Sequence, residues 1–155
     1  MTRFMVAAPV ALALLATPAA AQVTSLAGLR FGTVVAGVPE SVTPTSSDAA
    51  NYQIHYTVLG LATNFELTLP TTLSRAGGGA TMPVSFCTTC GIYRINNSNP
   101  CGGTTFNPAN NVSLPALVLN SNVYIWLGGT VSPASNQSAG SYTAGVVLTL
   151  YGVTL

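Results

Sequence analysis

The chain has 155 residues and almost no charge: only 5% are Asp, Glu, Lys or Arg, and the formal net charge is +1. So few cations cannot neutralise a phosphate backbone or hold an anionic lipid surface, which excludes nucleic acid and acidic membranes as partners. A charge-poor surface suits a protein that is covered by neighbouring subunits, because isolated soluble domains usually keep their net charge away from zero.

The first 21 residues have the features of an export signal. Arg3 supplies a positive start, residues 4–15 form a short apolar stretch, and residues 19–21 are the small residues that a signal peptidase recognises. The apolar stretch is shorter than the roughly 20 residues that span a bilayer, so a cleaved signal peptide, 1–21, is preferred to a membrane anchor. We expect the mature chain, 22–155, to be exported to the periplasm, the cell surface or the extracellular space, without a membrane span.

After the signal, short apolar segments are separated by turns rich in Gly, Pro, Asn and Ser, with no helical period and no internal repeat. Residues 29–31 open the domain. Alternating apolar residues predict four strands, at 52–58, 65–69, 82–86 and 114–118. Pro83 places the third of these at a sheet edge or a strand end, because proline cannot donate to a ladder.

Two more strands complete the pattern. Residues 123–127 form a compact apolar strand around Trp126, and Gly128 and Gly129 end it. In the last predicted strand, 142–153, one face consists of Ala144, Val146, Leu148 and Leu150. Six or more short strands with frequent turns predict a single all-β domain, an immunoglobulin-like Greek-key β-sandwich.

Groups that could perform chemistry are scarce. His55 is the only histidine, and the alternation of its strand places it opposite Ile54 and Tyr56, as a solvated or packed strand residue. The sequence contains no Gly-x-Ser-x-Gly nucleophile motif, no supported pair of catalytic carboxylates and no glycine-rich phosphate loop that opens a helix. We expect no enzymatic activity, no catalytic or metal-binding residues and no cofactor.

Three cysteines, Cys87, Cys90 and Cys101, lie in a long polar segment, 86–111. A C-x-x-C pair can be half of a zinc site or a redox pair, but zinc would need a fourth ligand and a redox pair normally begins a helix. In an exported protein a structural disulfide is the preferred interpretation. We expect Cys101 to pair with Cys90 or with Cys87, closing a loop worth about 3 kcal/mol and leaving one thiol over.

Two segments carry a family resemblance. LRFGTVVAG (29–37) resembles the L-x-F-G opening of secreted bacterial domains related to spore coat protein U. LGGTV (127–131), followed by QSAGSYT (137–143), resembles their closing Gly-Gly and Gln-x-Ala-Gly-x-Tyr segment with its terminal strand. An uncharacterised family of exported Gly/Thr-rich domains has similar openings and endings.

The resemblance implies an incomplete immunoglobulin-like fold that lacks one strand, like the subunits of archaic chaperone–usher pili. In such fibres the N-terminal segment of the next subunit supplies the missing strand. The candidate donor residues are Val23, Ser25 and Ala27, continued by Leu29 and Phe31. The implied function is a structural subunit of a surface pilus or coat, with like subunits, a periplasmic chaperone and an outer-membrane usher as partners.

The alternative is a self-contained secreted binding module, similar to an adhesin. It would use the polar loop 88–111, which carries Tyr93 and Phe106 and which the expected disulfide would hold in place. The two functions differ in one structural requirement, because a fibre subunit needs an unfilled place for a strand and a binding module does not.

Overall fold

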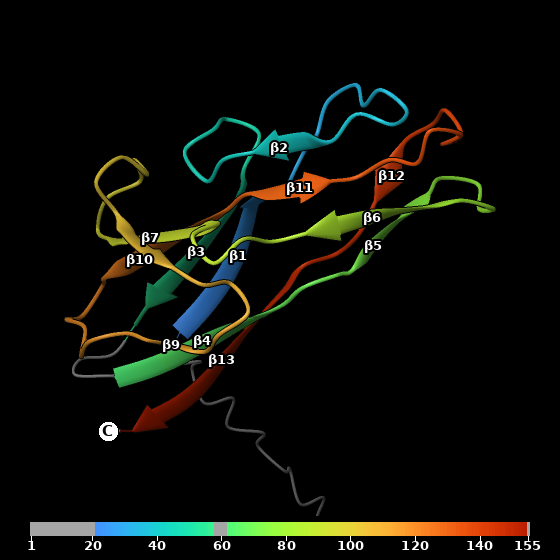
Figure 1. Cartoon of the computed structure of the whole chain (residues 1–155). Helices are drawn as coiled ribbons and strands as arrows, with labels where there is room; N and C mark the ends of the chain where they lie inside the picture. Colours follow the sequence, from blue (N-terminus) through green and yellow to red (C-terminus); the bar gives the residue numbers. More distant parts are fainter. Residues whose placement is uncertain (1–20, 58–61, 155) are drawn as a thin grey trace, which may run out of the picture.

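The computed structural model describes residues 21–57 and 62–154, which form strands and turns but no helix (Figure 1). The all-β prediction is confirmed. The signal peptide, apart from Ala21, and the predicted strand residue Val58 lie outside the described residues.

All strand pairs are antiparallel. The strands are β1 (Ala21–Ala27), β2 (Glu40–Val42), β3 (Ala50–Tyr56), β4 (Ala62–Thr68), β5 (Thr72–Arg75), β6 (Thr81–Ser85), β7 (Gly91–Ile95), β8 (Thr104–Phe106), β9 (Val112–Ser113), β10 (Asn122–Leu127), β11 (Gly129–Val131), β12 (Tyr142–Thr143) and β13 (Val147–Thr154).

These strands form three sheets. Sheet I has the order β1-β3-β10-β7-β8, sheet II the order β13-β4-β9, and sheet III the order β12-β5-β6-β11-β2. Sheet III is connected along the chain to both other sheets. Strand β11 directly follows β10 of sheet I, and β5 and β12 are next in the chain to β4 and β13 of sheet II. The chain therefore passes from sheets I and II at one end of the molecule into sheet III at the other (Figure 1).

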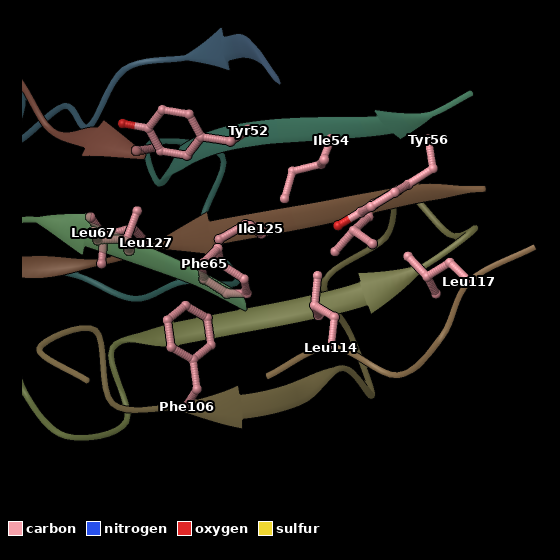
Figure 2. Close-up of a cluster of buried hydrophobic side chains, with 12 residues drawn as sticks. Tyr52, Ile54, Tyr56, Phe65, Leu67, Phe106, Leu114, Leu117, Ile125 and Leu127 are labelled. Carbon is pink, nitrogen blue, oxygen red and sulfur yellow. The ribbon is translucent and has the colours of Figure 1, made fainter. Parts of the chain in front are cut away.

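Sheets I and II enclose the larger of two apolar clusters, here called the main core (Figure 2). Strand β3 supplies Tyr52, Ile54 and Tyr56, which are buried, whereas the residues between them are only half-buried, as their alternation predicts. The ring of Phe65 stands edge-on to that of Phe106, with ring centroids 5.3 Å apart. The buried members are Ala50, Tyr52, Ile54, Tyr56, Phe65, Leu67, Phe106, Leu114, Leu117, Val123, Ile125 and Leu127.

A second core lies on one face of sheet III and is much smaller. Its buried members are Leu73, Met82, Val84 and Val131, and the partly buried side chains packed against them are Phe31, Val34, Phe86 and Tyr142. The alternation of β6 produces this face, because Met82 and Val84 are buried between exposed neighbours.

Gly128 marks the point where the chain passes from sheet I to sheet III. Strand β10 ends at Leu127 and β11 begins at Gly129, as the glycine pair predicted. A Cβ atom at Gly128 would lie 2.2 Å from the carbonyl oxygen of Val42 and 2.8 Å from the backbone nitrogen of Pro44. Only glycine lets the chain after β2 approach this junction so closely.

The predicted strand at 114–118 does not form. Strand β9 ends at Ser113, and Pro115 has no N–H with which to continue a ladder. Leu114 and Leu117 enter the main core three residues apart, while Val118 is exposed. Alternation in the sequence was therefore misleading at this position.

The predicted strand 142–153 is interrupted. Strand β12 ends at Thr143 and β13 begins at Val147, and the residues between them carry the chain from sheet III to sheet II. The predicted apolar face is partly present, because Val146, Leu148 and Leu150 pack against the main core. Ala144 is exposed.

The placement of Pro83 at a sheet edge or strand end was wrong, since β6 lies between β5 and β11. The carbonyl of Pro83 accepts the N–H of Ser132, one residue beyond the last β11 pair, Val131 with Val84. Proline has no N–H to donate, but the ladder between β6 and β11 has already ended at this position, so no ladder hydrogen bond is lost. The N–H of Val84 points to the other side and donates to Thr71.

Candidate functional site

A groove with a volume of about 840 Å³ lies over the second core. Its apolar floor consists of Leu73, Met82, Val84 and Phe86. Its two walls are chain segments that are not strands along most of their length: residues 28–36 on one side and residues 137–146 on the other.

The wall formed by residues 28–36 is held at its ends. The N–H of Arg30 donates to the carbonyl of Asp48 at 2.9 Å, and just after the wall the N–H of Gly37 donates to the carbonyl of Ala134 at 3.1 Å. Phe31 packs against the second core with its side chain only partly buried. The wall is thus fixed in place without being paired to a neighbouring strand.

The opposite wall is fixed by Tyr142. Its hydroxyl donates to the carbonyl of Ser138 at 2.7 Å and accepts from the Nε2 of Gln137 at 2.6 Å, while its ring packs against the second core. Gln137 Nε2 also lies 3.3 Å from the carbonyl of Thr81, in β6. Tyr142, in β12, therefore joins this wall to the second core through both its ring and its hydroxyl.

Beyond Tyr142 the wall continues as an unpaired sheet edge. Among the described strands, β12 pairs only with β5, and β13 pairs only with β4. Val146, Leu148 and Leu150 point toward the main core but stay only partly buried. Half-buried apolar side chains along an unpaired edge are the arrangement that an additional strand would cover.

The candidate donor residues fall into two groups. Val23, Ser25 and Ala27 lie in β1, which pairs with β3 at the edge of sheet I and has a bulge between Ser25 and Ala27. Leu29 and Phe31 follow the end of β1 and pack against the main core and the second core, respectively. The expected continuous donor strand therefore ends at Ala27.

Strand β1 is poorly covered where it lies. The side chain of Val23 is 42% exposed and that of Leu26 is 48% exposed, and Ser25 is exposed as well. Main-chain pairing with β3, rather than side-chain burial, holds this strand in place.

Segment 88–111 is not the long loop that was expected. It contains a hairpin, β7 and β8, and the connecting residues are held by Arg94, whose Nη1 donates to the carbonyls of Asn99 and Cys101. Phe106 is buried in the main core and is not available to a ligand. A hollow beside the hairpin measures about 190 Å³, below the roughly 300 Å³ at which ligand pockets begin.

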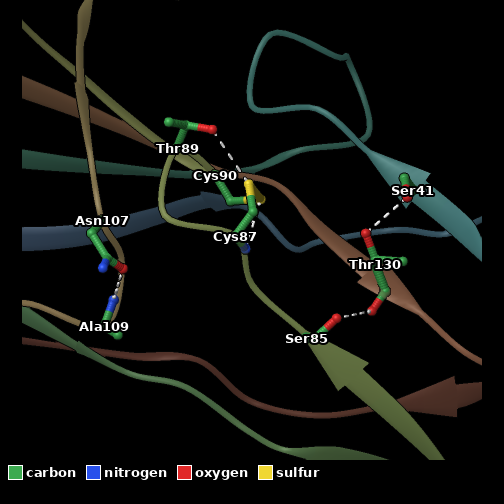
Figure 3. The surroundings of a disulfide bond; sticks show 8 residues. All are labelled: Ser41, Ser85, Cys87, Thr89, Cys90, Asn107, Ala109 and Thr130. Atoms are coloured by element: carbon green, nitrogen blue, oxygen red, sulfur yellow. Dashed lines mark hydrogen bonds between the residues drawn. A yellow bond between two sulfur atoms is a disulfide. The ribbon is translucent and has the colours of Figure 1, made fainter.

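The disulfide joins Cys87 to Cys90 (Figure 3), with Cα atoms 5.0 Å apart. Cys101 is an exposed free thiol. The expected pairing of Cys101 was therefore wrong. Cys87 and Cys90 close a turn before β7, whereas Cys101 lies in the loop after β7, at the far end of that strand. A loop of four residues is worth about 2 kcal/mol, less than the expected larger loop.

Titratable groups do not converge on a common point. His55 lies opposite Ile54 and Tyr56, as predicted, and its Nδ1 is 2.9 Å from Asn122 Oδ1. Within residues 21–57 and 62–154, no three His, Cys, Asp or Glu side chains are grouped closely enough to hold a metal ion. The same part of the chain contains no helix able to span a bilayer.

Three tyrosines have altered acidity. Burial raises the pKa of Tyr52, and burial also raises the pKa of Tyr56, partly offset by its hydrogen bond to Thr63. The hydrogen bond between Tyr151 and the Glu66 carboxylate raises the pKa of Tyr151. Each shift favours the neutral phenol and has a structural cause.

Sequence reasoning missed the groove itself. Its floor residue Leu73 lies in a short strand between Pro70 and the glycines that follow Arg75, where four residues give too little alternation to recognise. Comparison with protein-family models found no match, and comparison with curated proteins found none either.

Proposed function

We propose that this protein is an exported structural subunit of a surface pilus or coat, in which the N-terminal strand of one copy occupies the groove of the next. The observation that carries the proposal is the groove, with its apolar floor, the unpaired segment 28–36 and the edge strand β12, which among the described strands pairs on one side only. We propose further that the fold is immunoglobulin-like and lacks one strand, between residues 28–36 and β12.

The groove suits a strand better than a small molecule. A strand offers main-chain N–H and C=O groups to both walls, and alternate side chains to the floor. The floor is continuous with the second core, so the side chains of an inserted strand would extend that core. Without an occupant, the unpaired edge of β12 and β13 is a site for uncontrolled association.

Strand β1 of another copy suits the groove as occupant. Its seven residues span about 23 Å at the rise of an extended chain. Leaving β3 breaks main-chain hydrogen bonds that the groove walls would replace, while Val23, which is exposed on β3, would gain burial. For the donor strand, the exchange therefore replaces the main-chain hydrogen bonds that it loses and increases the burial of Val23.

Such an exchange is heterologous, because the donor strand and the groove are different surfaces of the same subunit. Heterologous contacts that do not close into a ring produce filaments. The low charge of the chain is compatible with subunits packed against one another. A periplasmic chaperone would cover the groove before assembly, and an outer-membrane usher would order the exchange.

The test compares two single substitutions in β1. Val23→Asp places a charge on the side chain proposed to enter the groove, and Thr24→Asp places the same charge on the neighbouring, opposite face. Both side chains are exposed in the subunit, so neither change should unfold it. Both are made with Cys101→Ser, which removes the free thiol as a source of covalent oligomers.

Assembly is followed by light scattering and size-exclusion chromatography of the exported protein. The proposal predicts oligomers for the parent and for Thr24→Asp, and monomers for Val23→Asp. Equal assembly of the two variants contradicts it. Stable monomers of all three proteins, including the parent, would favour the adhesin-like binding module instead and would direct attention to the loop between β7 and β8.

A further inference from the structure

We propose that the Cys87–Cys90 disulfide is a thiol–disulfide exchange site, at which an incoming thiolate attacks Cys87 Sγ and displaces Cys90 Sγ. This site lies outside the groove, and its activity does not depend on subunit assembly. Its substrate class is a small or exposed thiol in its thiolate form.

The two sulfur-bearing residues differ in accessibility. Cys87 is exposed, whereas Cys90 is only 7% exposed. Exchange requires the attacking thiolate to approach along the line of the S–S bond, so the accessible sulfur is the one that is attacked. The structure therefore gives the reaction a direction, with Cys87 as the electrophile and Cys90 as the leaving group.

The surroundings of Cys90 Sγ, the sulfur that leaves, stabilise a negative charge. The backbone N–H of Cys87 lies 3.1 Å from Cys90 Sγ and donates to it. A hydrogen bond from an N–H group stabilises a thiolate more than a neutral sulfur, because the acceptor is then ionised. On the attacked side, the hydroxyl of Thr89 donates to Cys87 Sγ, since a disulfide sulfur has no proton to give.

The backbone holds this turn without help from the disulfide. The N–H of Cys90 donates to the carbonyl of Cys87 at 3.1 Å, which closes the turn. The carbonyl of Cys90 accepts the N–H of Gly128 at 2.9 Å, which ties the turn to the junction of β10 and β11. Opening the S–S bond therefore leaves both cysteines in place and allows it to close again.

The step balances without an oxidant. The incoming thiolate forms a new S–S bond with Cys87 Sγ, the Cys87–Cys90 bond breaks, and its electron pair leaves on Cys90 Sγ. Return attack by Cys90 on Cys87 Sγ releases the thiol and restores the original disulfide.

The first experiment measures opening of the disulfide in the folded Cys101→Ser protein by reduced glutathione. Removing Cys101 is necessary because its exposed thiol would react by itself. Free thiols are alkylated at intervals and counted by mass, and the fluorescence of the buried Trp126 reports the fold. The proposal predicts an opening rate proportional to glutathione concentration, with unchanged fluorescence.

A disulfide that is only structural behaves differently. Its opening would wait for unfolding, so the rate would level off as glutathione increases and the fluorescence would change. That result overturns the proposal.

The second experiment tests the direction of attack. Cys90→Ser leaves Cys87 as a single thiol and Cys87→Ser leaves Cys90, each with Cys101→Ser. With oxidised glutathione, Cys87 should form the mixed disulfide at least about tenfold faster than Cys90, because only Cys87 is exposed. Equal rates, or a faster reaction of Cys90, contradict the proposed direction.

Discussion

The main core and the second core are built from the same kind of strand, yet only the main core is closed. In the main core, Ile54, Tyr56, Phe65, Val123, Ile125 and Leu127 are all 0% exposed, and sheets I and II cover them from both sides. In the second core, one face of sheet III meets only partly buried side chains and the groove. A well-packed core thus stabilises the domain, while the second core is left open at the groove, which is the site that we propose for a partner strand.

The difference follows from how the chain crosses between sheets. Pro70 and residues 144–146 interrupt the two long strand paths of sheet II where they enter sheet III. Residues 28–36 run past the same place without joining a sheet. Because the strands stop pairing at this place, no described strand covers the second core there, and the groove is left open.

The largest expected effect comes from truncating each core in turn. Ile125→Ala, in the main core, should lower the free energy of unfolding by about 4 kcal/mol, because its cavity is surrounded on all sides. Leu73→Ala, in the second core, should cost only about 2 kcal/mol, because the groove beside it already admits water. Urea unfolding of the monomer measures both; equal losses would remove the distinction between the cores.

The junction between the cores is tested by Gly128→Ala. The added methyl group would overlap the backbone of Val42 and Pro44, so we expect a loss of about 1–3 kcal/mol from forced displacement of the chain after β2. Gly145→Ala is the control, because a Cβ there has nothing within 4 Å. If the two substitutions lower the free energy of unfolding by the same small amount, the close approach at Gly128 does not matter for stability.

The disulfide connects the end of β6 to the start of β7, and so it lies between the two cores along the chain. Replacing both Cys87 and Cys90 with Ser should lower the free energy of unfolding by about 2 kcal/mol, the value for a four-residue loop. Denaturant unfolding of the double variant, in the Cys101→Ser protein, measures it. A loss of more than about 4 kcal/mol would mean that the disulfide constrains more than this turn.

The smallest effect is a pH dependence to which two tyrosines of the main core contribute. Burial raises the pKa of Tyr52 and Tyr56 above 10.0, so above pH 10 the unfolded state loses protons that the folded state keeps. Stability should therefore be complete below pH 10 and fall as the pH rises above it. Tyr52→Phe and Tyr56→Phe should each reduce this slope, and an unchanged slope in both variants would contradict the prediction. Unfolding curves measured between pH 8 and pH 11 test this prediction.

The sequence predicted the regular parts of the fold and missed the exceptions. Alternation in β3 identified buried residues correctly, because a strand covered on one face repeats every two residues. The compact apolar run at 123–127 likewise marked the strand β10. Alternation failed at Leu114 and Leu117, where Pro115 ends the pairing but the side chains still enter the core. It also failed at β7, whose five residues follow a polar turn.

For the candidate site, sequence reasoning named a candidate donor segment but could not identify the groove. The walls consist of residues 28–36 and 137–146, which are distant in sequence and have turn-like composition. The hydrogen bond from Gly37 N–H to the carbonyl of Ala134 joins these two parts of the chain, and no local pattern reveals it. Cysteine pairing was equally inaccessible, because loop length favours Cys101 while geometry places it at the wrong end of β7.

The most direct test of the account asks whether β1 of one copy lies against the groove wall of another. Val23→Cys is introduced in one preparation and Ala144→Cys in a second, isotopically labelled one, both with Cys101→Ser, and the two are mixed under mild oxidation. Ala144 is exposed and lies in the groove wall between β12 and β13. Val118→Cys, which is also exposed but does not line the groove, replaces it in the control. The account predicts cross-links of Val23→Cys protein to Ala144→Cys protein and none to Val118→Cys protein. Assembly without the first cross-link, or equal cross-linking to both positions, would contradict it.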